Sequence, residues 1–378
     1  MPYRTSYWEL TTFLRSPDVL IVGAGLTGLQ AALALKREAP TLEVLVVERA
    51  PLPRGASTRN AGFACFGGPT ELLADLDAYG ERAVVETVKK RYAGIQALAR
   101  NFAGRDIDWQ QLGGYELVDE AEKIAMVQDR LRGLNRLLRE VTGLEETWSV
   151  QQDVGPFVGN PLLLQNLLEA QLHPGKLVRL LLREAQTLGV RFLFGTKVEK
   201  IVNGTAHLSE LGILRPRQIL ITVNAFARAL LPEDFPEDIR PVRNQVLLSR
   251  LLPGFTLEGC YHYHEGYVYF RNVGPRRLLI GGARHLTGAD SETDQFGDNP
   301  VPVAFLLEKL RQWLPQHEWL PEDFTHRWSG IIAQGKGKTP ILRYASENVL
   351  VAARLAGMGV ALSADLATRA AAKVLTGK

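Results

Sequence analysis

Cysteine is scarce in this chain, which has only Cys65 and Cys260 among its 378 residues. Because these two do not form a Cys-x-x-Cys pair, the sequence can build neither a framework of several disulfides nor a cysteine-rich zinc site. We therefore expect a protein of a reducing compartment and place it in the cytoplasm.

Long apolar runs and an excess of one charge are also missing. No stretch approaches the roughly 20 apolar residues of a membrane-spanning helix, and Arg4, Glu9 and Arg15 interrupt the N-terminus where a signal peptide would be apolar. Lys and Arg total 44 against 41 Asp and Glu, a formal net charge of +3. Because positive and negative charges nearly balance, the composition does not indicate a phosphate-binding surface. We expect neither a membrane span nor a nucleic-acid partner.

The composition that is present is typical of a globular protein with more than one lobe. Hydrophobic residues make up 46% and charged residues 22% of the chain, which excludes a disordered chain, a coiled coil and a collagen. A length of 378 residues exceeds that of a usual single domain, roughly 100 to 200 residues. We therefore expect two packed lobes with a large buried core.

Residues 1–50 predict a βαβ unit that binds a dinucleotide. An apolar run at 19–22 leads into the pattern Gly23-x-Gly25-x-x-Gly28, and a helical stretch and a second strand ending at Glu48 follow. The first glycine permits a tight turn, the second lets a diphosphate approach the backbone, and the third lets helix and strand pack closely. The helix start offers unpaired N–H groups to the diphosphate. A carboxylate about twenty residues further on suits an adenosine ribose, which favours FAD or NAD over NADP.

Later segments carry a resemblance to a known family. They are the glycine-rich polar segment 55–63, the helix and strands at 181–200, the strand 219–225, and the strand, glycine turn and helix at 348–360. With these segments the chain resembles the D-amino acid oxidase, glycine oxidase and sarcosine oxidase family of FAD-dependent oxidoreductases over most of its length. A larger amine, as in the γ-glutamylputrescine-oxidase-like branch, is one substrate class within that resemblance.

The resemblance implies an α/β fold in which a Rossmann-like FAD-binding domain is joined to an α+β substrate domain built on an antiparallel sheet. The FAD-binding domain would be discontinuous, with residues 1–85, 150–230 and 328–378, and the substrate domain would take 86–149 and 231–327. We expect FAD to be bound without a covalent link.

The resemblance also implies which residues contact the cofactor. Ser57 and Arg59 would bind the phosphates or flank the ring, Val198 would contact adenine through its backbone, and Arg354 would lie by the flavin pocket. The C-terminal glycine turn would approach the ring, where N–H donors and a helix dipole suit the negative charge of reduced flavin. The full expected set is Gly23, Gly25, Leu26, Thr27, Gly28, Glu48, Arg49, Ser57, Arg59, Asn60, Ala61, Val198, Asn224, Arg354, Gly357, Met358, Gly359 and Val360.

Residues 261–271 predict a β-hairpin with a two-residue turn at Glu265 and Gly266, which the strand 277–284 would extend. Alternation places one set of side chains on a polar, aromatic face and gives the other face to the core. The first set is His262, His264, Tyr267, Tyr269 and Arg271, our candidates for substrate contacts. The alternative is an ordinary solvated sheet face. These histidines have neither His-x-x-His spacing nor clustered carboxylates, so we expect no metal.

The family's chemistry implies that a hydride passes from the carbon beside nitrogen to flavin N5 and leaves an imine, without an obligatory base. The sequence departs from the family's pattern at two places that bear on this chemistry. After Trp328-Ser329-Gly330 the sequence has isoleucines where amino-acid oxidases of the family have a carboxylate-binding arginine, so a simple amino acid needs Arg271 or another cation. Leu279 stands where sarcosine-oxidase-like members have a lysine that assists oxygen, so the acceptor is O2 or another oxidant.

Two other functions stay open on the sequence alone. The first is an NAD-dependent dehydrogenase that shares only the N-terminal βαβ unit, because the glycine pattern does not separate FAD from NAD. The second is a flavoprotein of the tRNA-modifying type, against which the small net charge argues. The number of subunits is not predicted.

Overall fold

The computed structural model describes residues 5–377, which form two compact units. Unit 1 combines the chain up to Thr58 with Gly175–Pro241 and the chain from Ile332 onward, and unit 2 combines Arg59–Pro174 with Val242–Ile331. The expected α/β class with a second mixed unit is confirmed. Among the described helices, none has an apolar stretch long enough to cross a membrane.

Unit 1 is built on a six-stranded sheet in the order β18-β19-β12-β1-β2-β8. Its strands are β1 (Val19–Val22), β2 (Val44–Glu48), β8 (Arg191–Phe194), β12 (Gln218–Ile221), β18 (Ile341–Ser346) and β19 (Val349–Ala353). All neighbours pair in parallel except β18, which pairs antiparallel with β19. The residues of β1 and β19 are buried throughout, because the strands of a parallel sheet are covered on both faces.

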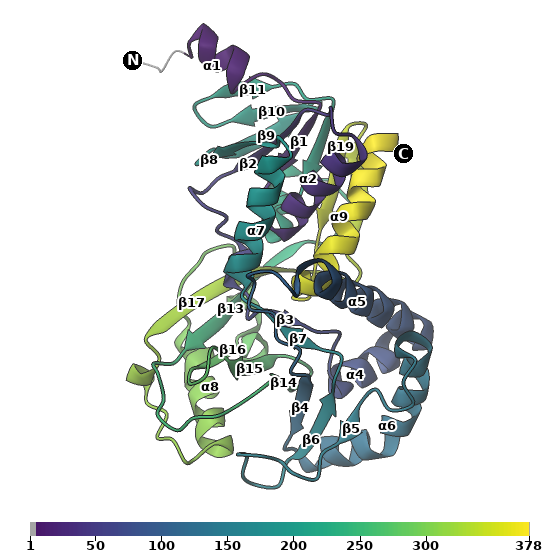
Figure 1. The fold of residues 1–378 in the computed structure, drawn as a ribbon, viewed down its shortest axis with the longest axis vertical. Coiled ribbons are helices and arrows are strands. Elements are labelled where there is room, and N and C mark those ends of the chain that lie inside the picture. The colour runs from purple at the N-terminus through teal and green to yellow at the C-terminus, as the bar shows by residue number, and fades with distance from the viewer. Residues whose placement is uncertain (1–4, 378) are drawn as a thin grey trace. The chain divides into compact units, whose positions relative to one another are not determined.

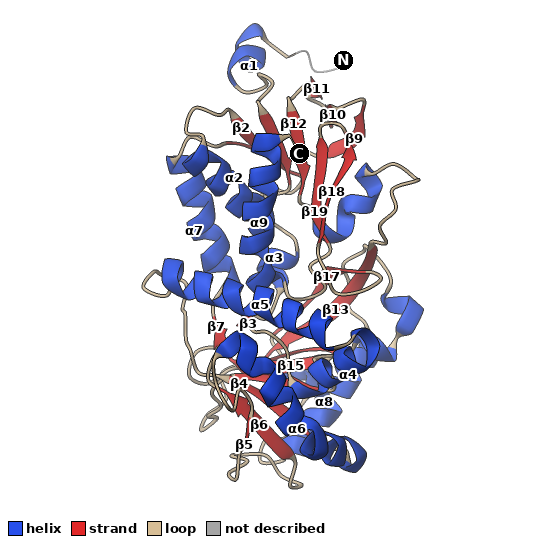
Figure 2. Ribbon diagram, turned by 90° about the vertical axis from the view of Figure 1, so that its right-hand side faces the viewer, coloured by secondary structure: helices blue, strands red, loops and turns tan. Residues whose placement is uncertain are grey.

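Helices and a small sheet complete unit 1. Helices α2 (Leu26–Glu38) and α9 (Gly359–Thr376) lie side by side (Figures 1 and 2), and Gln30 Nε2 donates to Ser363 Oγ at 2.7 Å between them. The other elements are α1 (Tyr7–Thr12), α7 (Pro174–Thr187), the 3-10 helix η1 (Asn224–Leu230) and the small sheet of β9 (Val198–Val202), β10 (Thr205–Leu208) and β11 (Gly212–Leu214).

Unit 2 is built on an eight-stranded sheet in the order β17-β13-β16-β15-β14-β4-β6-β5. The strands are β4 (Gly114–Val118), β5 (Ser149–Val150), β6 (Leu162–Asn166), β13 (Arg240–Leu248), β14 (Cys260–Tyr263), β15 (Val268–Asn272), β16 (Leu278–Gly282) and β17 (His326–Gln334). Strands β14 and β4 pair in parallel. One face of this sheet packs a large core of Tyr261, Phe270, Trp313 and their neighbours, while the other carries a smaller cluster around Ala61, Val246 and Leu279.

The remaining elements of unit 2 are mostly helical. Helices α4 (Pro69–Tyr79), α5 (Glu81–Phe102) and α6 (Ala121–Thr142) are grouped together in Figure 1, and α8 (Pro300–Trp313) packs apart from them. Short pieces are β3 (Phe63–Ala64), β7 (Ala170–Gln171), η2 (Arg284–Leu286), η3 (Gly288–Ser291) and η4 (Pro321–Asp323). Helix α3 (Ala56–Arg59) has its first three residues in unit 1 and its last in unit 2. Strand β3 pairs antiparallel with β7.

The predicted hairpin is confirmed. His262 pairs with Tyr269, and Tyr267 N donates to His264 O at 3.0 Å across the turn. Glu265 and Gly266 have φ of 56° and 74°, as a two-residue type I′ turn requires. The third strand of the prediction is β16, which pairs antiparallel with β15.

The boundaries of the two units differ from the predicted domain boundaries. Residues 59–85 and 150–174, expected in the nucleotide-binding domain, lie in unit 2, and residues 231–241, expected in the substrate domain, lie in unit 1. The reason is tertiary: α4 packs against α5 and α6, and β6 pairs with β4 in the large sheet. Sequence alone shows neither contact.

Candidate functional site

The first glycine loop joins β1 to α2. Gly23 has a φ of 105°, and a Cβ added to Gly28 would lie 2.1 Å from the carbonyl oxygen of Gly23. A Cβ on Gly25 would lie 2.9 Å from Ser57 Oγ, which also accepts from Leu26 N at 2.9 Å. The N-cap residue Gly25 supplies no side-chain acceptor, and Ser57 Oγ instead accepts from the first N–H group of the helix. A phosphate can therefore occupy this helix start without displacing a protein acceptor other than the Ser57 hydroxyl.

Glu48 ends β2 beside this loop. Its carboxylate accepts from Ala24 N and from Ala50 N, each at 3.1 Å. The Arg49 guanidinium lies 3.9 Å from the centre of the Phe226 ring, so its charge rests on an aromatic face within unit 1. Val198 is buried at the start of β9.

The C-terminal glycine turn joins β19 to α9 in the same unit. Gly357 has a φ of 87°, and α9 begins after Met358 without a side-chain cap. Asn224 Oδ1 accepts from Leu355 N at 3.2 Å and ties this turn to the end of β12. Because β19, β12 and β1 are adjacent parallel strands, their following loops emerge at one edge of the sheet, where α/β folds bind ligands.

Unit 1 therefore brings together most of the expected cofactor-binding residues, and their donor set fits an adenine dinucleotide. They are Gly23, Gly25, Leu26, Thr27, Gly28, Glu48, Arg49, Ser57, Val198, Asn224, Gly357, Met358, Gly359 and Val360. The starts of α2 and α9, whose N-cap residues supply no side-chain acceptor, offer N–H donors for anionic groups, and Glu48 offers acceptors for ribose hydroxyls.

Arg354 lies in unit 1 with its guanidinium engaged. It donates to Thr339 O, to Asp238 O and to a carboxylate oxygen of Glu237 at 3.1 to 3.4 Å. The residue is buried and has a φ of 59°. Its side chain holds loops of unit 1 together, and the predicted contact with flavin stays a prediction.

Arg59, Asn60 and Ala61 lie in unit 2. The Arg59 guanidinium donates to Ser329 O at 2.7 Å and lies 4.5 Å from the centre of the Phe296 ring. Asn60 Oδ1 accepts from Gly62 N at 2.8 Å. These contacts shape the start of the segment that leads into β3.

The face of the large sheet opposite the main core, here called the aromatic face, carries Phe63, His262, Tyr269 and Trp328. The ring of Phe63 meets those of His262 and Tyr269 edge-on, with centres 5.4 and 5.9 Å apart. Burial raises the pKa of Tyr269 to about 12, so its hydroxyl is a neutral donor at physiological pH. The alternative of a solvated face is wrong for His262 and Arg271, since both are buried.

Arg271 has a structural role that the sequence did not predict. Its guanidinium donates to Ala61 O at 2.5 Å, to Leu172 O at 3.0 Å and to Asn272 O at 3.3 Å. Burial lowers its pKa, and the three carbonyls satisfy the cation. These bonds argue against Arg271 as the cation that replaces the family's carboxylate-binding arginine.

His264 and Tyr267 lie at the hairpin turn, outside the paired strands. Lys123 Nζ lies 2.7 Å from His264 Nδ1, and the His264 ring stacks on His285 with centres 4.7 Å apart. The Tyr267 ring lies beneath the Arg284 guanidinium at 4.6 Å. The five predicted residues of the hairpin therefore form no single row, because a φ of 52° turns His264 out of the strand.

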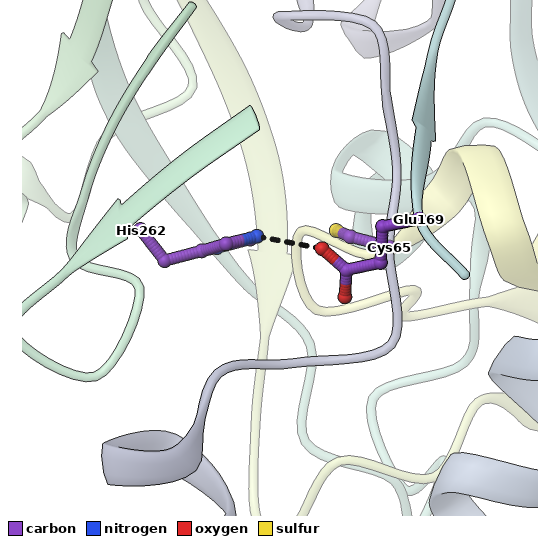
Figure 3. Close-up of side chains that lie close together, drawn as sticks. All are labelled: Cys65, Glu169 and His262. Atoms are coloured by element: carbon purple, nitrogen blue, oxygen red, sulfur yellow. Dashed lines mark hydrogen bonds and ion pairs between the residues drawn. The ribbon is translucent and has the colours of Figure 1, made fainter. Parts of the chain in front are cut away.

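A buried group of polar side chains, which the sequence did not indicate, includes His262 of the aromatic face together with Cys65 and Glu169 (Figure 3). His262 Nε2 points toward Glu169 Oε2 at 3.2 Å, with Cys65 beside the carboxylate. Glu169 Oε1 accepts from Phe66 N and Gly67 N at 2.8 and 3.4 Å. One ligand-type atom from each of Cys65, Glu169 and His262 lies within 4.8 Å of the others. Widely separated residues meet here, so no spacing in the sequence could reveal the group.

Burial and neighbouring charges shift the pKa values of this group. Burial alone would lower the pKa of His262, but the charge and hydrogen bond of Glu169 raise it overall. Burial, with the charge of Glu169, raises the pKa of the Cys65 thiol well above its usual range. Glu116, paired with His262 across β4 and β14, has its pKa raised to about 7 by burial. Cys, Glu and His side chains are of types that could hold a metal, but Glu169 and His262 are already hydrogen-bonded to each other.

Comparisons with known proteins point to one family. The model of the family described as "FAD dependent oxidoreductase" matches residues 18–372. The chain is 24% identical over 366 residues to a probable oxidoreductase, OrdL, of Rhizobium meliloti, covering 92% of this chain and 81% of that protein. It is 21% identical to the gamma-glutamylputrescine oxidoreductase of Escherichia coli, covering 95% and 84%. The crystal structure of glycine oxidase from Geobacillus kaustophilus shares the fold, with a TM-score of 0.73, 20% identity and coverage of 96% and 95%.

Proposed function

The chain belongs to the DAO family of FAD-dependent oxidoreductases, and on that premise we propose that it oxidises the carbon–nitrogen bond of an amine or amino acid to an imine. The names of a gamma-glutamylputrescine oxidoreductase and a glycine oxidase support an amine substrate. The observation that supports the proposal is the edge of the unit 1 sheet, where the starts of α2 and α9 offer N–H donors and Glu48 offers acceptors of the kind a dinucleotide needs.

In the proposed reaction, FAD held by unit 1 would supply the acceptor for the hydride that leaves the carbon beside nitrogen, while the nitrogen lone pair would form the C=N bond and the N–H proton would pass to solvent. Water then converts the imine to a carbonyl compound and an amine. The loops Gly23–Gly28 and Gly357–Val360 would hold the cofactor without a covalent bond. Both thiols, Cys65 and Cys260, are buried in unit 2.

The aromatic face of unit 2 would receive the substrate. Phe63 and Trp328 supply apolar surface, and Tyr269 supplies a neutral hydroxyl donor. Such a lining excludes water and positions a neutral amine without a catalytic base. Leu279 packs in the small cluster of this face beside Val246, so no cation from its position would assist oxygen. The acceptor is O2 or another oxidant.

An anaerobic flavin-reduction screen tests the proposal. Purified holoprotein should be yellow, with about one FAD per chain, and should be bleached by a member of a panel of primary and secondary amines and both amino-acid enantiomers. NADH should not bleach it. Readmitted O2, compared with an artificial acceptor, would then identify the oxidant. Bleaching by NADH alone would reject an amine substrate.

A further inference from the structure

We propose that Cys65, Glu169 and His262 form a zinc site inside unit 2, with a water molecule as the fourth ligand. The proposal goes beyond the proposed amine oxidation and does not depend on it, because it concerns an ion held within the folded unit. The expectation of no metal considered only residues close to the histidines in the sequence. Among residues 5–377, these three side chains are the one set of this kind whose ligand atoms all lie within 4.8 Å of one another.

The backbone brings the three side chains together. Strand β3 pairs antiparallel with β7, with Ala64 opposite Ala170, and continuing that register sets Cys65 opposite Glu169. Opposed residues share one face of a sheet. In Figure 3 the sulfur of Cys65 and an oxygen of Glu169 both point toward the ring of His262, which β14 supplies. Three segments of unit 2 therefore converge on one point.

The separations of the ligand atoms suit a tetrahedral ion after a small adjustment. Zn2+ bound by nitrogen, oxygen and sulfur at about 2.0 to 2.3 Å keeps its ligand atoms roughly 3.3 to 3.6 Å apart. His262 Nε2 and Glu169 Oε2 are already 3.2 Å apart. The sulfur of Cys65 lies within 4.8 Å of the ligand atoms of the other two. A side-chain movement of about 1 Å would complete the set.

Exchange of protons for Zn2+ leaves the net charge of this buried group unchanged. Without metal, a neutral thiol and the Glu169 carboxylate accompany a histidine whose charged form that carboxylate favours. Zn2+ would replace the thiol proton of Cys65 and the proton on His262 Nε2, and both protons would pass to solvent. A thiolate, a carboxylate and a neutral imidazole then balance the two charges of the ion. The exchange therefore avoids the cost of burying a net charge.

Backbone donors hold the Glu169 carboxylate in the orientation that the site requires. Glu169 Oε1 accepts from Phe66 N at 2.8 Å and from Gly67 N at 3.4 Å. The other oxygen, Oε2, is the one that faces His262. Outer contacts of this kind fix the ligands of metal sites before the ion arrives.

A buried donor beside the carboxylate lacks an acceptor. Asn166 is 2% exposed, and its Nδ2 has no hydrogen-bond partner among the described residues. Its Oδ1 accepts from Leu168 N and Glu169 N, each at 3.0 Å, so the orientation of the amide is fixed. A Cβ added to Gly114 would lie 2.7 Å from Asn166 Nδ2 and 2.0 Å from Glu169 Oε2, so the donor lies beside that oxygen. Water on Zn2+ would supply the missing acceptor.

Neighbouring groups of suitable type are already bound elsewhere. Glu71 pairs with Arg91 at 3.1 Å, and Glu116 accepts from Thr70 N at 2.8 Å. The thiol of Cys260 donates to a backbone carbonyl at 3.5 Å. A thiolate, an imidazole and a carboxylate are ligands that Zn2+ accepts together, whereas Mg2+ and Ca2+ prefer oxygen alone. The ligand set therefore indicates zinc.

Reconstitution with Zn2+ tests the proposal. Tag-free holoprotein is stripped with a chelator, incubated with excess Zn2+ and desalted, and its zinc and FAD contents are measured. The wild type and Cys260→Ser, which replaces the other buried thiol, should retain about one Zn2+ per chain. Cys65→Ser should retain less than about a tenth of that amount at unchanged FAD content. A wild type that retains no Zn2+, or Cys65→Ser that retains as much as the wild type, would overturn the proposal.

Co2+ in place of Zn2+ keeps the proposal testable if a variant folds poorly. Tetrahedral Co2+ absorbs in the red, where oxidised flavin does not, and a thiolate ligand strengthens this absorption. We expect the red bands in the wild type and Cys260→Ser, and their loss in Cys65→Ser and His262→Gln. Zn2+ should also raise the thermal midpoint of the wild type, because an ion bound only by the folded state stabilises it. Absence of both effects from the wild type contradicts the site.

Discussion

The two units present their candidate sites by different means. In unit 1 the groups offered to a ligand are mainly backbone N–H groups at the ends of adjacent parallel strands, set by glycines a few residues apart. In unit 2 they are side chains such as Phe63, Tyr269 and Trp328, brought together from distant segments. A cofactor site made of backbone groups can therefore be predicted from the spacing of residues in the sequence. A substrate site made of side chains from distant segments can be recognised only in the folded structure.

The largest effects of substitution on folding and FAD binding are expected at the first glycine loop. Gly28→Ala should prevent folding of unit 1, because its Cβ would meet the Gly23 carbonyl, which is backbone and cannot move aside. Gly25→Val should leave a folded protein without FAD, because its side chain fills the phosphate position and displaces only the Ser57 side chain. Soluble yield, circular dichroism and FAD content measure both variants. Stoichiometric FAD in Gly25→Val would show that this loop does not hold the diphosphate.

This contrast also explains what the sequence could predict. The strand, turn and helix at 19–38 and the type I′ turn at Glu265 and Gly266 were predictable, because short-range spacing and the freedom of glycine determine them. The meeting of Cys65, Glu169 and His262 was not, because three separate segments supply them. Nor could the sequence show that carbonyl groups bind Arg271, because Ala61 and Leu172 come from distant segments of the chain.

In unit 2 the next largest effect should come from its buried ion pair. Arg91→Met removes the ion-pair partner of Glu71 and the donor to Phe66 O, and we expect it to lower the free energy of unfolding by about 3 to 5 kcal/mol. Arg130→Met, which breaks an exposed pair with Asp77, should change it far less, because water and salt screen the two charges. Urea denaturation followed by tryptophan fluorescence compares the two. Equal effects would mean that burial of the Arg91 pair has no energetic consequence.

A smaller effect should appear in the pH dependence of stability. Burial raises the pKa of Glu116 in the folded state to about 7, against the hydrogen bonds from Thr70, while the unfolded carboxyl ionises near 4.5. The contribution of Glu116 to the free energy of unfolding is therefore fully present below about pH 4.5 and is lost as the pH rises to about 7. The glutamine side chain of Glu116→Gln does not titrate, so its free energy of unfolding should fall less over this pH range. The fall that Glu116 causes in the wild type is at most about 3 kcal/mol.

The same denaturation at pH 4.5, 6 and 8 checks this prediction. His262 also has a raised pKa, so a residual fall as the pH passes above about 6.5 should survive in Glu116→Gln. Asp77→Asn, at an exposed carboxyl whose pKa its hydrogen bond to Arg130 lowers, is the control and should keep the wild-type slope between pH 4.5 and 7. Parallel curves for the wild type and Glu116→Gln would show that Glu116 ionises normally in the folded protein.

The most direct test of amine oxidation by this protein is anaerobic single-turnover reduction of the flavin by a reactive amine. The amine carries hydrogen or deuterium on the carbon beside nitrogen. We expect the oxidised-flavin absorption to disappear in one step that is slower with deuterium, because that carbon gives up its hydride in the step observed. Flavin that no amine reduces, or that is reduced only by NADH, would contradict amine oxidation by this protein.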